Sequence, residues 1–367
     1  MNRTASVAPR PRVAFVMEQT LGHITHTANL ERRLPTDDRI DATVLRIPFE
    51  VDGCPRLVPG YRNWTVRAGW RARRAVGGRR APFDALVVHT QVPAIGMADI
   101  LRRVPTVVSL DATPIQYDEL GEHYRHAVGP RAVERLKWRA NRACFDAAAR
   151  LVTWADWTRA SLVDDYGVAA DKIDVIAPGV DVETWSCPRA RESRPVLKVL
   201  FVGGDLTRKG GLELLAAVSR AQERGCPIEL DVVTRDPVPE APGVRAFHDL
   251  GPNDPALRQL YCDADVFALP TRGDCLPMVF SEAGAVGLPS VATDVGAIGE
   301  IVRHDVTGLL VPLGDVDALT DALLRLGADE PLRRRLGVAA REHVHANFDA
   351  AVNARRLVDV VLGMLGT

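Results

Sequence analysis

The stretch ADVFALPTRGDCLPMVFSEAGAVGLPSVATDVGAIGEIV, residues 264–302, decides the fold. An apolar run that predicts a β-strand ends at Pro270, a loop then carries Asp274, and a helix is expected to begin near Ser281 with Glu282 in its first turn. In a parallel α/β sheet, such a strand–loop–helix unit places its loop at the carboxyl edge, where open sheets bind ligands. The two acids are therefore expected to lie at a ligand site.

Short β-branched runs alternate with amphipathic stretches along the chain, which is the pattern of strands and crossover helices in parallel sheets. The expected strands are residues 13–17, 42–47, 85–89, 106–110 and 150–154 in the first half, and residues 198–204, 229–234, 264–270, 289–294 and 308–312 in the second. Between the halves, residues 173–185 break into Pro and Gly and residues 189–196 are charged, which predicts a linker. A chain of 367 residues with 47% apolar content suits two domains. The sequence predicts an α/β protein with two Rossmann-like domains.

The charges exclude one class of partner. Lys plus Arg number 46 against 47 Asp plus Glu, so the formal net charge is -1. Because no global basic field would attract nucleic acid, we expect no nucleic-acid partner.

The cysteines and the N-terminus indicate the compartment. The 6 cysteines are scattered, without a C-x-x-C pair or metal-ligand spacing, and are interpreted as thiols in a reducing environment. The first apolar run, VAFVM, is too short for a signal-peptide core or a membrane span. We therefore expect a cytoplasmic protein. A peripheral position at the membrane is compatible with this expectation.

Residues 199–218, VLFVGGDLTRKGGLELLAAV, carry a second motif. A strand leads into a turn at Gly203 and Gly204, the pair Arg208 and Lys209 follows, and apolar residues then recur at helical spacing. Glycines let the backbone approach a diphosphate, a helix start offers N–H donors, and the two cations add full charges. The motif predicts a diphosphate site. Since no metal-clamping acid pair follows a strand, we expect no cofactor and no obligatory metal.

Residues 270–293, PTRGDCLPMVFSEAGAVGLPSVAT, resemble family 4 of the retaining glycosyltransferases, of the group 1 type. The mark of that family is Glu-x7-Glu in a frame like P-S-x-x-E-x-F-G-L-x-x-x-E-A-M-A-x-G-x-P-V-V-A-T. The chain keeps the frame, with Asp274 at the first acid and Glu282 at the second. The resemblance implies the GT-B fold, in which two Rossmann-like domains place parallel sheets facing across a cleft, and it implies retaining transfer from a nucleotide sugar.

The resemblance also implies roles for single residues. Glu282 would accept hydrogen bonds from ribose hydroxyls, and Asp274 would hold hydroxyls of the donor sugar. Lys209, together with Arg208, would grip the donor diphosphate. Backbone N–H groups would complete the sugar contacts, although the proline in the loop has none to give. The loop residues concerned, in place of the usual F-G-L, are Leu276, Pro277 and Met278.

In the first half of the chain, the resemblance rests on fewer residues. The turn in residues 18–30, EQTLGHITHTANL, would place the backbone of Gly22 near the donor phosphates and His23 or His26 close to the cleft. A helix-start hydrogen bond is an equal alternative for either histidine. Asp111 stands where many relatives have a histidine that contacts the donor sugar. The catalytic set is therefore expected to be Asp274, Arg208, Lys209, Asp111 and His23.

The resemblance divides the chain into three parts. Residues 1–188 would form the acceptor-side domain, residues 189–347 the donor domain, and residues 348–367 a terminal helix that crosses back to the first domain. Glu300, in GAIGEIV, is interpreted as a solvated helix residue outside the site.

The resemblance implies a hexosyltransferase that prefers a UDP-sugar to a GDP-sugar. Its acceptor is unidentified, and a lipid-linked or polysaccharide acceptor is considered. The carboxylate pair of retaining glycosidases is not recognisable, so the family's front-face attack is expected, in which the leaving phosphate takes the acceptor proton. A nucleotide-sugar epimerase of the same architecture and a catalytically silent sugar-nucleotide-binding protein stay as alternatives. An NAD-dependent enzyme is excluded because neither glycine turn reads G-x-G-x-x-G.

Residues 60–80, GYRNWTVRAGWRARRAVGGRR, combine arginines with two tryptophans and contain no acid. This composition suits an anionic membrane or a lipid-phosphate acceptor, with a solvated basic face as the equal alternative. The residues are Arg62, Arg67, Arg71, Arg73, Arg74, Arg79 and Arg80, with Trp64 and Trp70.

Overall fold

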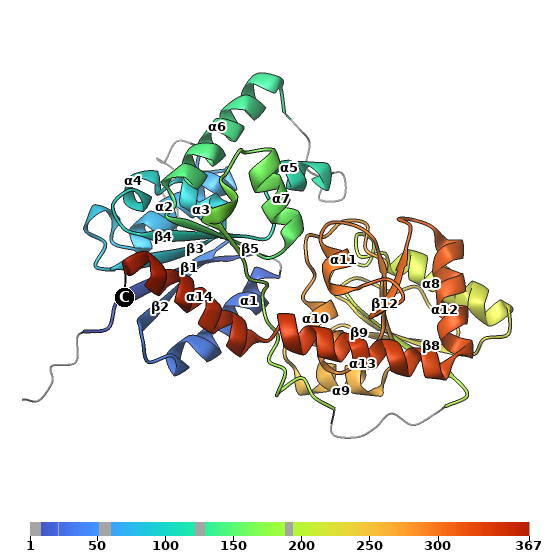
Figure 1. Cartoon of the computed structure of the whole chain (residues 1–367). Coiled ribbons are helices and arrows are strands. Elements are labelled where there is room, and N and C mark those ends of the chain that lie inside the picture. Colours follow the sequence, from blue (N-terminus) through green and yellow to red (C-terminus); the bar gives the residue numbers. More distant parts are fainter. Residues whose placement is uncertain (1–8, 21, 51–59, 122–128, 188–193, 367) are drawn as a thin grey trace, which may run out of the picture.

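The computed structural model describes residues 9–20, 22–50, 60–121, 129–187 and 194–366, and it shows two α/β domains (Figure 1). Each domain is built on a six-stranded sheet, with the order β2-β1-β3-β4-β5-β6 in the first and β12-β11-β10-β7-β8-β9 in the second. The strand pairs of both sheets are parallel. The predicted α/β class with two parallel sheets is confirmed.

The strands follow the apolar runs of the sequence. The first sheet holds β1 Arg12–Gln19, β2 Asp41–Pro48, β3 Ala85–His89, β4 Thr106–Leu110, β5 Arg150–Thr153 and β6 Ile173–Val175. The second holds β7 Leu197–Val202, β8 Ile228–Val233, β9 Val244–Phe247, β10 Val266–Leu269, β11 Ser290–Thr293 and β12 Gly308–Val311. Every residue of β3 and β4 is buried, because helices cover both faces of the sheet. Each predicted strand overlaps one of these strands.

Two edge strands were not predicted. β6 has 3 residues and lies inside the segment that the sequence indicated as irregular, and β9 has 4 residues, none of them buried. Such short, partly exposed strands carry no apolar run. The helix that carries Glu282 begins at Val279, two residues before the predicted start at Ser281.

The helices cover both faces of the sheets. Alternate residues of β1 belong to two separate cores: Val16 packs in a core shared with α2, α6 and α7, and Phe15 packs in a core shared with α1 and α14. The helices of the first domain are α1 His23–Arg33, α2 Trp64–Ala75, α3 Gln91–Ile95, α4 Ala98–Leu101, α5 Pro114–Glu119, α6 Arg131–Ala147 and α7 Asp156–Asp164. Those that follow are α8 Gly211–Glu223, α9 Pro255–Asp263, α10 Val279–Ala285, α11 Ile298–Ile301, α12 Val316–Ala328, α13 Glu330–Asn347 and α14 Ala350–Leu365.

The last helix, α14, lies against the first domain although it follows the second domain in sequence (Figure 1). Leu357 and Val361 are buried in the same core as Phe15. At the crossing point, the Val180 N–H donates to the Phe348 carbonyl at 2.9 Å. The chain end therefore ties the domains together. The predicted boundary between residues 188 and 189 lies outside the described residues and stays a prediction.

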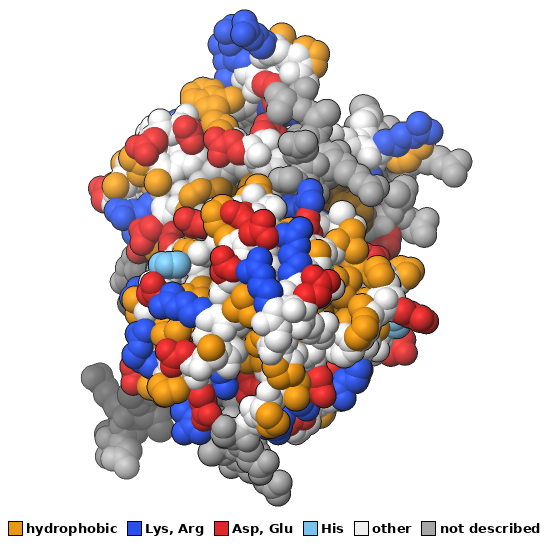
Figure 2. All heavy atoms as spheres, turned by 90° about the vertical axis from the view of Figure 1, so that its right-hand side faces the viewer, with side chains coloured by type: hydrophobic (Ala, Val, Ile, Leu, Met, Phe, Trp, Pro, Cys, Tyr) orange, Lys and Arg blue, Asp and Glu red, His pale blue; other side chains and the backbone are white. Residues whose placement is uncertain are grey.

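The exposed face of the second domain mixes both signs of charge. Arg220 of α8 and Arg224, the residue after α8, pair with Asp317 and Asp321 of α12 at 2.5 and 2.8 Å. Figure 2 shows basic and acidic side chains interspersed over this face. This face therefore carries no field of a single sign.

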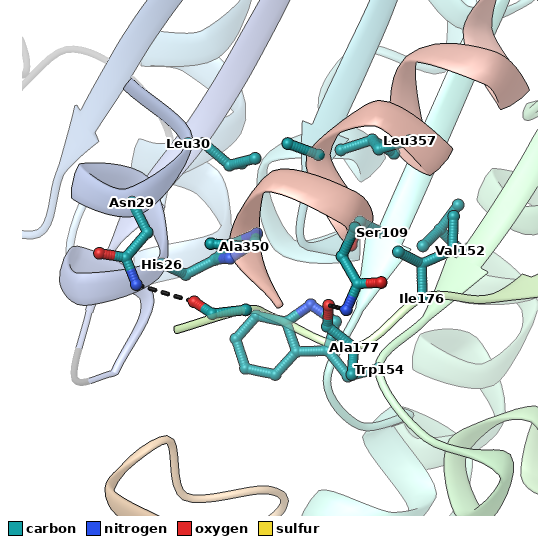
Figure 3. A pocket seen from close by; sticks show the side chains of 13 residues that line it. His26, Asn29, Leu30, Ser109, Val152, Trp154, Ile176, Ala177, Ala350 and Leu357 are labelled. Carbon is teal, nitrogen blue, oxygen red and sulfur yellow. Dashed lines mark hydrogen bonds between the residues drawn. The ribbon is translucent and has the colours of Figure 1, made fainter. Parts of the chain in front are cut away.

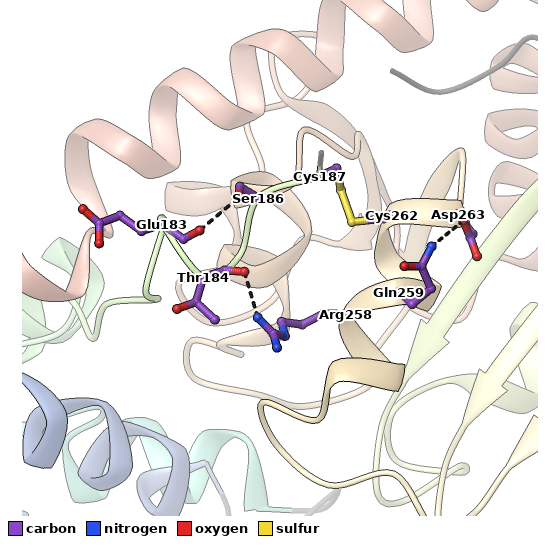
Figure 4. Close-up of a disulfide and its surroundings, with 8 residues drawn as sticks. All are labelled: Glu183, Thr184, Ser186, Cys187, Arg258, Gln259, Cys262 and Asp263. Carbon is purple, nitrogen blue, oxygen red and sulfur yellow. Dashed lines mark hydrogen bonds between the residues drawn. A yellow bond between two sulfur atoms is a disulfide. The ribbon is translucent and has the colours of Figure 1, made fainter. Parts of the chain in front are cut away.

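The interpretation of all cysteines as thiols was wrong for one pair. Cys187, which follows β6 and the connecting segment, forms a disulfide with Cys262 of α9, 75 residues later (Figure 4). Cys144, Cys226 and Cys275 are free thiols, and Cys54 lies outside the described residues. The expected cytoplasmic location loses the support that it drew from the cysteines.

Reduction of the Cys187–Cys262 disulfide should destabilise the protein. A crosslink that closes a loop of 75 residues removes unfolded-chain entropy worth about 4 kcal/mol on a simple loop-entropy treatment. We expect tris(2-carboxyethyl)phosphine to lower the thermal midpoint of the wild type and of a Cys226→Ser control. It should not change the midpoint of the Cys187→Ser/Cys262→Ser variant. A wild-type midpoint that the reductant leaves unchanged would refute the crosslink.

Candidate active site

The second domain brings the two sequence motifs together around the carboxylate of Asp274. Lys209 Nζ donates to both carboxylate oxygens, at 2.9 and 2.8 Å. Arg208 Nη1 donates to one of them at 3.2 Å, and the Thr271 hydroxyl donates to the other at 2.7 Å. Asp274 follows β10, whereas Lys209 and Arg208 lie between β7 and α8. Two neighbouring strand ends therefore build one charged cluster.

The backbone of the two loops holds this cluster in place. Gly210, the residue before α8, has φ +76°, and a Cβ there would collide with the carbonyl oxygen of Pro270. Only glycine fits this approach of the turn to the end of β10. Arg208 adds two contacts across the loops: its carbonyl accepts from the Arg272 N–H, and its guanidinium donates to the Gly273 carbonyl, both at 2.8 Å. Of the predicted turn glycines, Gly203 is buried and Gly204 is exposed.

The cluster is largely closed to solvent and carries an excess of positive charge. The side chains of Asp274, Arg208 and Lys209 are only 10%, 11% and 14% exposed. Burial would raise the pKa of Asp274, but Lys209 and Arg208 outweigh burial and hold the pKa below its ordinary value. In the part of the chain that the structure describes, Asp274 pairs with both cations, and Asp205, 3.8 Å from Arg208, is 53% exposed and screened by water. The cluster is thus suited to attract an anion.

Glu282 lies deeper, on α10, where 5% of its surface is exposed. The Tyr261 hydroxyl donates to its carboxylate at 3.0 Å. Burial raises the pKa of Glu282 to about 7, although the hydrogen bond from Tyr261 acts in the opposite direction. Tyr261 is itself held between Trp185 and Phe267. The remaining predicted donor residues, Leu276, Pro277 and Met278, are also buried.

The first domain contributes a partly buried ion pair. His23 begins α1, and its Nε2 lies 3.1 Å from Asp111, just after β4. Burial lowers the pKa of His23, but the attraction of Asp111 and Glu18 outweighs burial and raises it. The pKa of Asp111 is lowered: burial raises it, and His23 overcomes that effect. Gly22 is the exposed residue that precedes α1.

His26 lies behind this pair and takes no part in it. Its pKa is lowered to about 3 by burial and by His23, so it is neutral at physiological pH. It packs edge-on against Trp154 with ring centroids 5.1 Å apart. The structure therefore selects His23 over His26 as the histidine that pairs with Asp111.

We call the cluster of Asp274, Lys209 and Arg208 and the pair of His23 and Asp111 the two half-sites. They lie on edges of the domains that face each other. Tyr117 of the first domain interacts electrostatically with residues of both domains. Burial, Cys275 and Asp111 raise its pKa, and Arg208 acts in the opposite direction. Burial and the charges of Asp111 and Asp274 together raise the pKa of Cys275 well above its ordinary value. Residues of both domains thus share one electrostatic environment.

Two cavities lie in the described part of the first domain, one behind the His23–Asp111 pair and one at the opposite edge of the sheet. A cavity of about 20 Å³ between α1, β5 and α14 is lined by His26, Asn29 and Trp154 (Figure 3). It has room for about one water molecule and none for a sugar. An open hollow of about 620 Å³ lies beside Leu101 and Ala147, which precede β4 and β5. It is at the amino edge of the first sheet, opposite the half-site.

A family model described as Glycosyltransferase Family 4 matches residues 22–184, and one described as Glycosyl transferases group 1 matches residues 197–329. Together they cover every strand of both sheets except β1, which ends before residue 22. The chain belongs to the family 4, group 1 glycosyltransferases.

Curated relatives carry glycosyltransferase names. The chain is 28% identical to the D-inositol 3-phosphate glycosyltransferase of Paenarthrobacter aurescens, over 65% of this chain and 64% of that protein. It is 35% identical to the protein of the same name from Corynebacterium diphtheriae, over 54% and 52%. The chain therefore spans between 52% and 64% of the length of these two relatives.

Solved structures give the architecture. Sucrose-phosphate synthase from Thermosynechococcus elongatus superposes with a TM-score of 0.75 at 17% identity, over 97% of this chain and 100% of that chain. HepE of Anabaena, in complex with UDP and glucose, superposes with a TM-score of 0.69 at 15% identity, over 96% and 100%. At these identities the likeness shows the fold alone, and that fold is GT-B.

Most arginines of residues 60–80 have partners within the first domain. Arg67 is buried and donates to the carbonyls of Tyr61 and Arg62, at 3.1 and 2.7 Å. Arg73 pairs with Asp99, and Arg71 bonds a backbone carbonyl. Fewer of these guanidinium groups are therefore available to an external partner than the sequence indicates. The role of the stretch as a membrane surface stays a prediction.

Among the described residues, no helix is long and apolar enough to span a membrane, and no group of three or more His, Cys, Asp or Glu side chains could hold a metal ion. The expectation that no metal is needed stays a prediction.

Sequence reasoning missed several partners of the site. Thr271, Tyr261 and Glu18 carry no motif of their own, yet each hydrogen-bonds a charged or polar group at or near a half-site. Glu300, interpreted as solvated, accepts two backbone hydrogen bonds from the other domain. Only a three-dimensional arrangement reveals these contacts.

The buried carboxyl of Glu282 should make stability depend on pH. Its pKa is about 7 in the folded protein and 4.5 ordinarily, so between these values the folded chain holds a proton that the unfolded chain has lost. The free energy of unfolding therefore falls as pH rises through this window. Glu282→Gln should be more stable than the wild type above pH 7, by roughly 3 kcal/mol at most, and the difference should vanish below pH 4.5.

Urea unfolding of both proteins across this pH range tests the assignment. Glu342→Gln, at an exposed position of α13, is the control and should keep the wild-type pH dependence. Parallel curves for Glu282→Gln and the wild type would show that folding does not shift the pKa of Glu282 and would contradict the assignment.

Proposed function

We propose that this glycosyltransferase moves a sugar from a nucleoside diphosphate sugar to an acceptor with retention at the anomeric carbon. The observation that carries the proposal is the cluster of Lys209 and Arg208 around Asp274 at the carboxyl edge of the second sheet. Buried cations at a strand-to-helix turn fit a diphosphate, and α8 begins at Gly211 with N–H groups that add to the positive potential.

In the proposed complex, the donor diphosphate replaces Asp274 as the partner of Lys209 and Arg208. The carboxylate, still bonded by Thr271, is then available to the hydroxyls of the donor sugar, while Glu282 receives the ribose. The bond from the anomeric carbon to the β-phosphate oxygen breaks, and the bond to the acceptor oxygen forms on the same face. The acceptor proton passes to the departing phosphate, whose charge the two cations stabilise. No divalent ion is required in this scheme.

The His23–Asp111 pair belongs to the acceptor-side domain and faces the donor loops. We propose that it contacts the reacting end of the donor sugar, with Asp111 in the place of the family's histidine. An Asp111 nucleophile remains outside the proposal because nothing in its geometry favours a covalent intermediate over its ion pair with His23.

The proposed identities of the nucleotide and the acceptor are based on sequence relatives and structural neighbours. The Anabaena structure was solved with UDP and glucose, which supports a UDP-sugar. A mycobacterial relative, 31% identical over 57% of this chain and 60% of that protein, is named a GDP-mannose-dependent mannosyltransferase acting on a phosphatidylinositol monomannoside. We propose UDP before GDP, and an acceptor that is lipid-linked, a polysaccharide or a polyol phosphate. A peripheral membrane position through residues 60–80 would suit a lipid-linked acceptor.

Lys209→Ala should weaken the binding of nucleoside diphosphate by ~10–100-fold, because it removes a charge-assisted contact in a site largely closed to solvent. Calorimetric titration with UDP, GDP, ADP and dTDP measures this effect and identifies the base. Lys209→Arg, which keeps the charge, should retain most of the affinity. Lys137→Ala, on α6, is the matched control and should bind like the wild type.

The thermal midpoint of each variant shows whether it is folded. If folded Lys209→Ala binds every nucleotide as the wild type does, the diphosphate lies elsewhere. If the folded wild type binds none of them, a nucleoside diphosphate donor is excluded.

A further inference from the structure

Glu300 joins the two domains through the start of a helix. α7 begins at Asp156, and the residue before it, Ala155, has no side chain that could cap the helix. Instead, the carboxylate of Glu300, from α11 of the second domain, accepts from the Asp156 and Trp157 N–H groups at 2.9 and 2.7 Å. A carboxylate at a helix start satisfies free N–H donors and the positive end of the helix dipole. The cap of α7 is therefore supplied by the other domain.

The capped turn of α7 is bonded to the half-site of the first domain. The Thr158 hydroxyl donates to the Asp111 carbonyl at 2.7 Å. The Trp157 carbonyl accepts from the side chain of Gln116, on α5, at 2.8 Å. A displacement of the first turn of α7 would thus move the residue that pairs with His23.

On the other side, Glu300 belongs to a segment fixed to the donor loop. The Glu300 N–H donates to the Ala297 carbonyl at 3.0 Å, and the Ala297 N–H donates to the Cys275 carbonyl at 2.9 Å. Gly296 has φ +57°, and a Cβ there would collide with the Asp274 carbonyl oxygen. The Glu300 carbonyl also accepts from His343 of α13 at 2.8 Å. The segment is therefore held against the peptide that carries Asp274.

We infer that Glu300 is a positioning residue that aligns the half-site of Asp111 and His23 with the half-site of Asp274 and Lys209. Hydrogen bonds and one close backbone contact run without a break from the Asp111 loop through α7 and Glu300 to the Asp274 loop. Apolar contacts accompany them, because Trp154 and Ala155 pack in the core of the second domain. The inference rests on the proposed function because it assumes that both half-sites act on one donor.

A different explanation is that Glu300 only caps α7, and two variants separate the explanations. Glu300→Ala removes both the cap and the link between domains. Adding Ala155→Ser to Glu300→Ala supplies a local hydroxyl cap without restoring the link. Glu300→Gln keeps an acceptor oxygen and should retain at least half of the wild-type turnover.

The readouts are donor consumption with UDP-glucose and GDP-mannose, D-inositol 3-phosphate as the probe acceptor, UDP and GDP affinity by calorimetry, and the radius of gyration by small-angle scattering. For Glu300→Ala we expect turnover to fall by ~10-fold or more and the radius of gyration to rise. The Kd of the nucleotide should stay within about twofold, since the diphosphate contacts lie in the second domain alone. In the double variant, the thermal midpoint should recover while turnover and radius should not.

Recovery of turnover and radius in the double variant would reduce Glu300 to a helix cap and overturn the inference, as would a wild-type radius in Glu300→Ala. Failure of the proposed function would show differently: the wild type itself would bind neither nucleotide. The scattering and melting comparisons would still decide the role of Glu300 in that event.

Discussion

The contact of Asp274 with Lys209 and Arg208 is the interaction on which the rest of the site depends. A diphosphate site needs cations that are in place before the ligand arrives, and cations in a largely closed position are costly without a counter-charge. Asp274 supplies that charge, and Thr271 fixes its second oxygen. The same contact fastens the loop after β10 to the turn before α8, since the backbone bonds of Arg208 and the close approach of Gly210 act on the same pair of loops. In the resting protein, a carboxylate occupies the place that we propose for the phosphate.

The cluster belongs to one domain, so transfer needs a defined relation to the other domain. Three features set this relation in the structure. α14 returns to the first core, the connecting segment is bonded to α1 through Asn29 and the Gly179 carbonyl at 2.8 Å, and Glu300 caps α7. The disulfide from Cys187 adds a covalent tie between this segment and α9, beside the tyrosine that holds Glu282. The donor residues and the connection between domains are thus physically adjacent.

The apolar strands and the two motifs could be predicted from the sequence because burial on both faces leaves an uninterrupted apolar run, and because strand ends in a parallel sheet meet at one edge. Asp274, Lys209 and Arg208 were expected at one site, and the structure brings them within hydrogen-bonding distance. Their roles toward a donor remain proposals.

What the sequence could not show depends on contacts between distant residues. The pairing of Cys187 with Cys262 spans 75 residues and leaves no spacing signal. Arg67 looked like surface charge, but its partners are backbone carbonyls, which no sequence pattern marks. In the sequence Glu300 looks like an ordinary helix residue, because its contact with α7 exists only in the folded chain. β9 was missed because it is short and lies at an edge.

A crystal structure with the nucleoside diphosphate that binds most tightly tests the account most directly, through the distance from Lys209 Nζ to the nearest β-phosphate oxygen. We expect a hydrogen-bonded contact of about 2.8 Å, with Asp274 displaced from Lys209 and the ribose at Glu282. A diphosphate bound elsewhere, with the Lys209–Asp274 contact intact, would contradict it.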